Sequence, residues 1–101
     1  MYERETKILC DAIKEFGEHA QLQMVIEECA ELIKAVCKYL RNPVEDNKIY
    51  ILEEIADVLI MIQQVQIMYG FEMVNDFRRE KILRLESRIY AHQQRGSGNN
   101  E

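Results

Sequence analysis

Apolar residues recur every three or four positions in four segments of the chain, which is the spacing expected for one face of an α-helix. This spacing predicts helices over about residues 2–16, 20–40, 48–69 and 72–93. The second segment is strongly amphipathic, with apolar residues at Leu22, Val25, Ile26, Cys29, Leu32, Ile33, Val36 and Leu40. No stretch alternates apolar and polar residues as a half-buried strand would. The pattern therefore predicts an all-α protein with a fold like a four-helix bundle.

Glycine and proline separate these segments. Gly17 and Gly70 each follow an apolar segment, and glycine commonly ends a helix at that position. The stretch RNPVEDN contains Pro43, which disfavours helix in the residue before it, together with polar cap and turn formers. The polar ending RGSGNNE has no apolar anchor, so we expect it to be disordered. The sequence thus predicts one helical domain over residues 1–94 and a disordered tail over residues 95–101.

Composition and charge narrow the classes of protein to consider. Of the 101 residues, 48% are apolar and 31% are charged, as in a soluble globular domain. The net charge of −5 argues against general affinity for nucleic-acid backbones, which requires an excess of Lys and Arg. No apolar run approaches the roughly 18 residues of a membrane span, and the start MYERETK lacks the apolar segment of a signal peptide. We therefore expect a cytoplasmic protein that binds neither nucleic acid nor membranes.

Two acidic pairs lie within apolar sequence. Glu28 and Glu31 are three residues apart in IEECAEL, as are Glu54 and Asp57 in LEEIADV, so each pair shares one face of its helix. The short break near residue 44 favours antiparallel neighbouring helices, and Glu31 and Asp57 lie equally far from it along the chain. Four carboxylates can then converge. Ligands that offer only oxygen suit a hard divalent cation, above all Mg²⁺.

The same pattern has a simpler interpretation. An acidic pair on one helix is ordinary and usually lies on a solvated face. Asp57, which its apolar neighbours should hold partly away from water, needs a compensating charge. A Lys or Arg of a neighbouring helix can supply that charge as well as a metal ion can. Lys34 and Lys38 are expected to be surface partners of Glu31 and its neighbours. Spacing alone leaves both interpretations open.

The chain resembles the all-α nucleoside triphosphate pyrophosphatase superfamily, specifically its short MazG-like branch. Three segments carry this resemblance: EFGEHAQLQMVIEECAELIKAVCKYLR, EEIADVLIMIQQ and KILRLESRI. The resemblance covers about residues 10–90. Its signature is ExxE, a spacer and ExxD, which is matched by Glu28 with Glu31 and by Glu54 with Asp57. The resemblance implies that these four residues bind Mg²⁺, or Mn²⁺ as a substitute, and that the ion holds the triphosphate of a nucleotide. In this family, water attacks the α–β phosphoanhydride and releases a nucleoside monophosphate and pyrophosphate.

The resemblance also assigns roles outside the acidic pairs. Lys81 and Arg84 match a Lys and an Arg of the family's late helix that contact phosphate, and Arg88 continues the same face. Alternatively, these three residues form a basic face exposed to solvent, or they form ion pairs with the acidic helices. Glu27 or Glu53, beside the expected ligands, can orient or deprotonate the attacking water, or either can be a surface residue.

Apolar residues on more than one side of the second and third segments are hard to cover within one chain. We therefore expect a homodimer or homotetramer, as the resemblance also implies. Two functions remain open: a Mg²⁺-dependent pyrophosphohydrolase of nucleoside triphosphates, or a non-catalytic helical dimer that acts as a nucleotide-sensing or protein-interaction module. The candidates for contact with a base are Gln21, Tyr39 and Tyr50, each of which can instead have a structural role. The sequence does not identify which base is bound.

Overall fold

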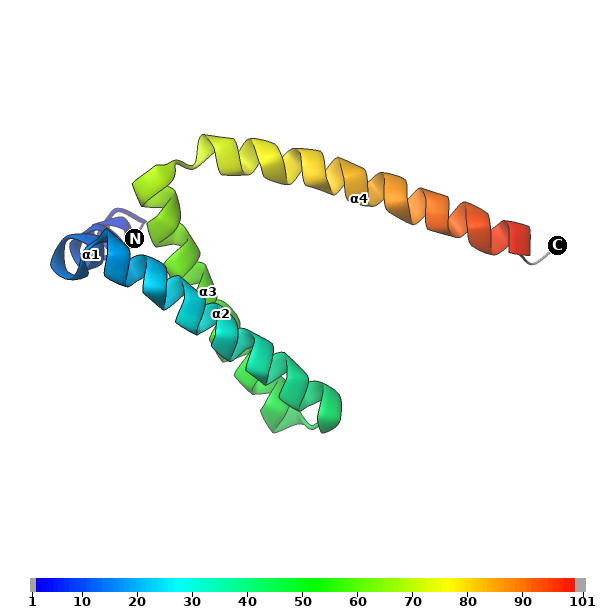
Figure 1. Ribbon diagram of the computed structural model, residues 1–101, viewed down its shortest axis with the longest axis horizontal. Helices are drawn as coiled ribbons and strands as arrows, with labels where there is room; N and C mark the ends of the chain where they lie inside the picture. Colours follow the sequence, from blue (N-terminus) through cyan, green and yellow to red (C-terminus); the bar gives the residue numbers. More distant parts are fainter. Residues whose placement is uncertain (1, 100–101) are drawn as a thin grey trace. The chain divides into compact units, whose positions relative to one another are not determined.

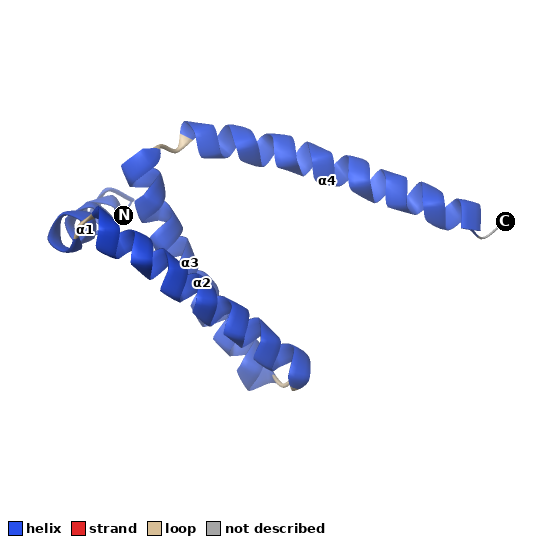
Figure 2. Cartoon of the chain, viewed as in Figure 1, coloured by secondary structure: helices blue, strands red, loops and turns tan. Residues whose placement is uncertain are grey.

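The computed structural model describes the backbone of residues 2–99 and the side-chain environments of residues 3–96. It contains the helices α1 (Tyr2–Phe16), α2 (Glu18–Arg41), α3 (Glu45–Tyr69) and α4 (Glu72–Asn99) (Figure 1). These described residues form no strand (Figure 2), so the prediction of an all-α fold with four helices is confirmed. None of the helices in this range is long and apolar enough to cross a membrane. The chain divides into two units, the first ending at Tyr69 and the second beginning at Gly70.

The first unit is built on a hairpin of α2 and α3, which run antiparallel, and α1 contacts both helices (Figure 1). The backbone N–H of Asn42 donates to the carbonyl oxygen of Lys38 at 3.0 Å and ends α2. The buried side chain of Asn47 donates from Nδ2 to the carbonyl oxygen of Asn42 at 2.9 Å and closes the turn. Because Glu45 and Asp46 place acidic groups at the positive end of the helix dipole, α3 begins earlier than the predicted position 48.

Gly17 separates α1 from α2. Its φ of 89° lies in the left-handed region, where a residue with a Cβ atom is strained. Its N–H donates to the carbonyl oxygen of Ile13 at 2.9 Å, and its own carbonyl accepts from the N–H of Gln21 at 3.1 Å, so it ends one helix and precedes the next. At this open end of the hairpin, the Tyr69 hydroxyl donates to the Glu18 carboxylate and joins α3 to α2.

The interior of the first unit is small. Among the described side chains, the buried apolar ones are Ala35 and Met61. Along the outer face of α2, in contrast, Ile26, Ile33 and Leu40 are 70%, 64% and 74% exposed. These three residues recur every seven positions and form one stripe along the helix. The described residues of this unit therefore leave a row of apolar side chains uncovered on α2.

The second unit consists of α4, which carries an ion pair between Arg79 and Asp76. The sequence predicted that this helix would end near residue 93 and that residues 95–101 would be disordered. The helix instead continues through Gly96 to Asn99, while residues 100–101 lie outside the described part of the chain. Extending an existing helix adds one hydrogen bond for each residue fixed, and no proline interrupts it here. The end of the helix was therefore predicted too early.

Candidate metal centre

Three carboxylates from two helices converge in the hairpin. Glu28 of α2 and Glu54 and Asp57 of α3 each offer one oxygen, and these atoms all lie within 4.8 Å of one another. Glu54 and Asp57 come together because they lie one turn apart on α3. Glu28 reaches them because the short turn makes α2 the antiparallel neighbour of α3. The structure thus brings together three of the four carboxylates that were predicted from the two motifs.

The charges of this cluster oppose one another. The pKa of Glu28 is raised, first because partial burial removes water from its carboxyl group and then because the carboxylates of Asp57 and Glu54 repel its charged form. The pKa of Glu54 is raised by the same causes, burial first and the charge of Asp57 second. Among residues 3–69, whose side chains are described, no Lys or Arg forms an ion pair with these three carboxylates. The cluster is therefore a negative site that a cation would stabilise.

One expectation about Asp57 is wrong for the single chain. Its apolar neighbours in the sequence were expected to hold it partly away from water, but its side chain is exposed. The nearby Ile55 and Leu59 are themselves 39% and 52% exposed, so the described residues of this unit leave much of the surface around Asp57 uncovered. Repulsion between carboxylates, rather than burial of Asp57, is therefore what favours a cation here.

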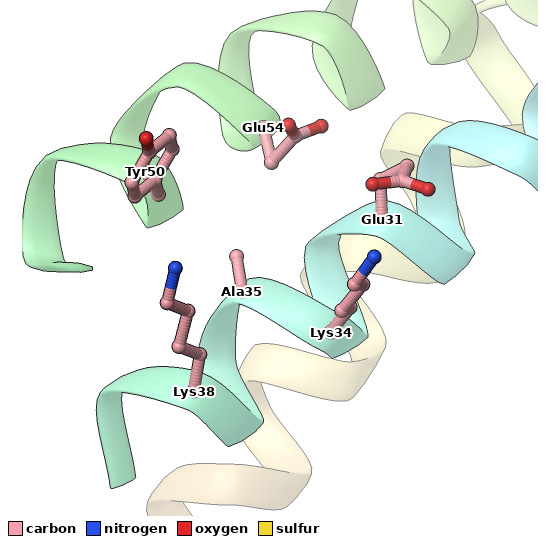
Figure 3. Close-up of a pocket in the computed structure, with 6 residues that line it drawn as sticks. All are labelled: Glu31, Lys34, Ala35, Lys38, Tyr50 and Glu54. Atoms are coloured by element: carbon pink, nitrogen blue, oxygen red, sulfur yellow. The ribbon is translucent and has the colours of Figure 1, made fainter. Parts of the chain in front are cut away.

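Glu31 lies beside this cluster and not within its closest group. Its side chain is exposed, and its charge adds to the repulsion that raises the pKa of Glu28 and of Glu54. Together with Glu54 it lines a groove between α2 and α3 with a volume of about 280 Å³ (Figure 3). The other residues that line this groove, which we call the lysine groove, are Lys34, Ala35, Lys38 and Tyr50.

The two lysines of this groove do not have the role that was expected of them. Neither Lys34 nor Lys38 forms an ion pair with Glu31 or another carboxylate of the first unit. Lys38 instead places its Nζ atom 5.0 Å from the centre of the Tyr50 ring. The spacing of Glu31, Lys34 and Lys38 indicates that these residues share one face of α2, because residues three and four apart lie on the same side of a helix. The sequence could not show that the opposite wall would be α3.

A second pocket, of about 390 Å³, adjoins the cluster on the side of Glu27. Its walls are mostly apolar and are formed by Phe16, Ala20, Gln21, Gln23, Met24, Glu27 and Met61. Glu27 is exposed, and its charge contributes to the raised pKa of Glu28, so it lies close to the metal-binding candidates as its proposed role requires. Gln21, a candidate for contact with a base, is buried and bonded to Gln64.

The basic residues that the resemblance assigns to phosphate are all exposed on α4. Lys81, Arg84 and Arg88 share one face of that helix by their spacing, as predicted. Within α4 the described ion pair is Arg79 with Asp76, and it involves none of these three residues. Because α4 belongs to the second unit, a contact between these residues and the acidic cluster stays a prediction.

Comparison with known proteins finds no matching family model, no match among curated proteins and no matching solved structure.

Proposed function

We propose that the protein is a Mg²⁺-dependent pyrophosphohydrolase that cleaves nucleoside triphosphates to the monophosphate and pyrophosphate. The observation that supports this most strongly is the convergence of Glu28, Glu54 and Asp57 within 4.8 Å, with no ion pair to a cation among the described residues of their unit. The motifs that form this cluster are the ones on which the resemblance to the MazG-like branch depends. Oxygen ligands of this kind suit Mg²⁺, and Mn²⁺ can substitute for it.

In such a reaction, different residues of the first unit have different roles. Glu28, Glu54 and Asp57 hold the ion, and Glu31 extends the acidic surface toward the lysine groove. When bound, Mg²⁺ supplies charge neutralisation for the phosphate oxygens, which is the main requirement of phosphoryl transfer. Glu27, exposed beside Glu28, orients the attacking water or accepts its proton.

The substrate also needs a place for its base. The apolar pocket beside Glu27 presents Phe16, which is 65% exposed, together with Met24. An aromatic ring and a flexible thioether form a surface on which a planar base can stack without strict selection. The phosphates of the substrate are contacted by three basic residues of α4, as the resemblance implies: Lys81, Arg84 and Arg88.

We further propose that the active form is a homodimer or homotetramer. The apolar stripe of Ile26, Ile33 and Leu40 supports this, because a second copy can bury it by helix packing. The alternative function, a non-catalytic helical dimer, would use the same stripe. In that alternative, the carboxylates would be compensated by Lys81, Arg84 and Arg88 in place of an ion. We favour the enzyme because the resemblance assigns the same carboxylates to Mg²⁺.

The test is pyrophosphate release from a panel of ribo- and deoxynucleoside triphosphates, with Mg²⁺ and with EDTA. Release that requires Mg²⁺ and is lost in Glu54→Gln is the expected result, and a preference within the panel would name the base. Glu15→Gln on α1 removes a charge far along the sequence from the motifs and serves as the control. A folded protein that releases pyrophosphate from none of these substrates would contradict the proposed function.

A further inference from the structure

The lysine groove continues directly from the acidic cluster. Glu54 belongs to both, and Glu31 lines the groove beside it (Figure 3). Along α2 the side chains that follow Glu31 on this face are Lys34 and Lys38, so the charge changes from negative to positive within two helical turns. A ligand that contains both a cation and an anion would match this change of sign.

The two lysines are available to such a ligand. Neither forms an ion pair within the first unit, although four carboxylates lie on the same two helices nearby. Each ammonium group carries three hydrogen-bond donors and is a strong partner for phosphate oxygens. Both lysines belong to the same unit as the carboxylates, so the groove is complete without α4.

The shape and walls of the groove favour a phosphate chain over a base. Its volume of about 280 Å³ lies just below the range of roughly 300–1,000 Å³ that is usual for sites of complete small-molecule ligands. The Tyr50 ring is the aromatic surface in the groove, and the ammonium group of Lys38 lies over its face at 5.0 Å from the ring centre. A base would have to displace this cation before it could stack. The apolar pocket beside Glu27 offers a base a better surface.

We propose that the lysine groove is the binding site for a diphosphate group, held by Lys34 and Lys38 next to the ion at Glu54. In a bound triphosphate this group is the β,γ-diphosphate, and after hydrolysis it is the pyrophosphate product. That assignment rests on the proposed function, whereas binding of diphosphate by the groove can be measured without turnover. The substrate then lies along α2, with its terminal phosphates toward the turn between α2 and α3.

The experiment measures binding of inorganic pyrophosphate to the full-length protein in the presence of Mg²⁺ by isothermal titration calorimetry. The double variant Lys34→Gln/Lys38→Gln should bind pyrophosphate about tenfold more weakly or worse, because it loses two charge-assisted contacts. Its affinity for Mg²⁺ alone should not decrease. Lys14→Gln, which removes one positive charge from α1, should bind pyrophosphate as the unmodified protein does.

A conservative variant separates a binding role from a structural one. Lys34→Arg/Lys38→Arg keeps both positive charges and should retain most of the affinity for pyrophosphate. The proposal is overturned if the unmodified protein does not bind pyrophosphate, or if the Gln variant binds it equally well. If pyrophosphate binding depends on both lysines but the protein hydrolyses no triphosphate, the proposed function is overturned, and the assignment of the groove as a diphosphate site is retained. If the protein hydrolyses triphosphates but the Gln variant binds pyrophosphate unchanged, the proposed function is supported and the role of the lysine groove is overturned.

Discussion

The side-chain amide of Gln21 on α2 donates a hydrogen bond to the side-chain oxygen of Gln64 on α3 at 2.6 Å, and both residues are buried. The amide of Gln64 in turn lies 3.8 Å from the sulfur atom of Met61. Among the described side chains, these two glutamines connect parts of the sequence that are far apart, within an interior that has few apolar residues. The bond therefore helps to fix how the two helices face each other.

Breaking this pair should destabilise the fold. Gln64→Ala leaves the amide of Gln21 buried without its partner, which should lower the free energy of unfolding by about 1–3 kcal/mol. Urea denaturation followed by circular dichroism measures the change. Gln63→Ala, at an exposed position of the same helix, is the control and should have little effect. The double variant Gln21→Leu/Gln64→Leu removes both polar groups and should recover most of the loss. A loss as large in the double variant as in Gln64→Ala would show that packing, not hydrogen bonding, is responsible.

Loss of one carboxylate should make the protein insensitive to Mg²⁺. An ion that binds the folded state at 100 times its Kd stabilises it by about 2.7 kcal/mol, so Mg²⁺ should raise the Tm of the unmodified protein. Asp57→Asn should abolish this increase. It should also raise the Tm in EDTA, because the charge of Asp57 contributes to the repulsion that Glu28 and Glu54 experience. Thermal unfolding with and without Mg²⁺ tests both effects, and Glu15→Gln should respond to Mg²⁺ normally. Equal Mg²⁺ responses in Asp57→Asn and the unmodified protein would remove Asp57 from the metal ligands.

Acidification should stabilise the metal-free cluster. The pKa values of Glu28 and Glu54 are raised above the ordinary value of 4.5, so the folded state binds protons at these groups more readily than the unfolded state. Their contribution to stability is therefore fully present below pH 4.5 and is lost as the pH rises through their raised pKa values. Urea denaturation in EDTA at a series of pH values measures the slope. The variant Glu28→Gln/Glu54→Gln should lack this part of the slope, and an identical pH profile in both proteins would show that the two groups are not coupled to folding.

The basic face of α4 should matter for substrate binding. If Arg84 contacts phosphate, Arg84→Ala should raise KM about tenfold and leave kcat nearly unchanged, as expected for a contact of equal strength in the ground and transition states. Arg79→Ala is the matched control, because Arg79 lies on the same helix but pairs with Asp76. Steady-state kinetics with the preferred triphosphate gives both constants. Equal KM values for Arg84→Ala and Arg79→Ala would exclude Arg84 from the site.

The apolar stripe on α2 should mediate self-association. A charge at its centre, as in Ile33→Asp, should reduce the molecular mass measured by size-exclusion chromatography with light scattering to that of one chain. Ile33 is 64% exposed in the single chain, so the substitution should not disturb the interior of the hairpin. Lys48→Asp, at an exposed position of α3, is the control and should keep the mass of the unmodified protein. A monomeric unmodified protein, or an oligomer that persists in Ile33→Asp, would contradict the assignment.

The features that could be predicted from the sequence are those set by local spacing. Periodic apolar residues located the helices, and Pro43 with its polar neighbours located the turn. Counting residues from that turn predicted that Glu31 and Asp57 would lie at the same height, but the closest group joins Glu28 to Glu54 and Asp57 and leaves Glu31 beside it. The period of a helix and the shortness of a turn fix the approximate height at which residues meet, but the counted position was in error by one helical turn on α2.

The features that could not be predicted depend on what the other helix contributes. The apolar sequence around Asp57 indicated burial, but burial requires a covering surface, and the first unit does not supply one. For Gln21 the sequence left open a contact with a base or a structural role, because its partner Gln64 lies in another helix. Lys34 and Lys38 looked like partners of Glu31 because the groove between the helices cannot be seen from one helix alone. In each case the missing information was a contact between distant parts of the chain.

The bond between Asn47 and the carbonyl of Asn42 also has a consequence for how the sequence can vary. It anchors the first turn of α3, and Glu54 follows Asn47 by about two helical turns, so the two side chains share one face. A single residue inserted between them would rotate Glu54 by about 100° and shift it by about 1.5 Å along the axis. The carboxylate would then point away from Glu28, although every ligand would still be present in the sequence. The acidic cluster thus depends on the length of this segment as much as on its composition, and insertions or deletions there should be far more damaging than substitutions.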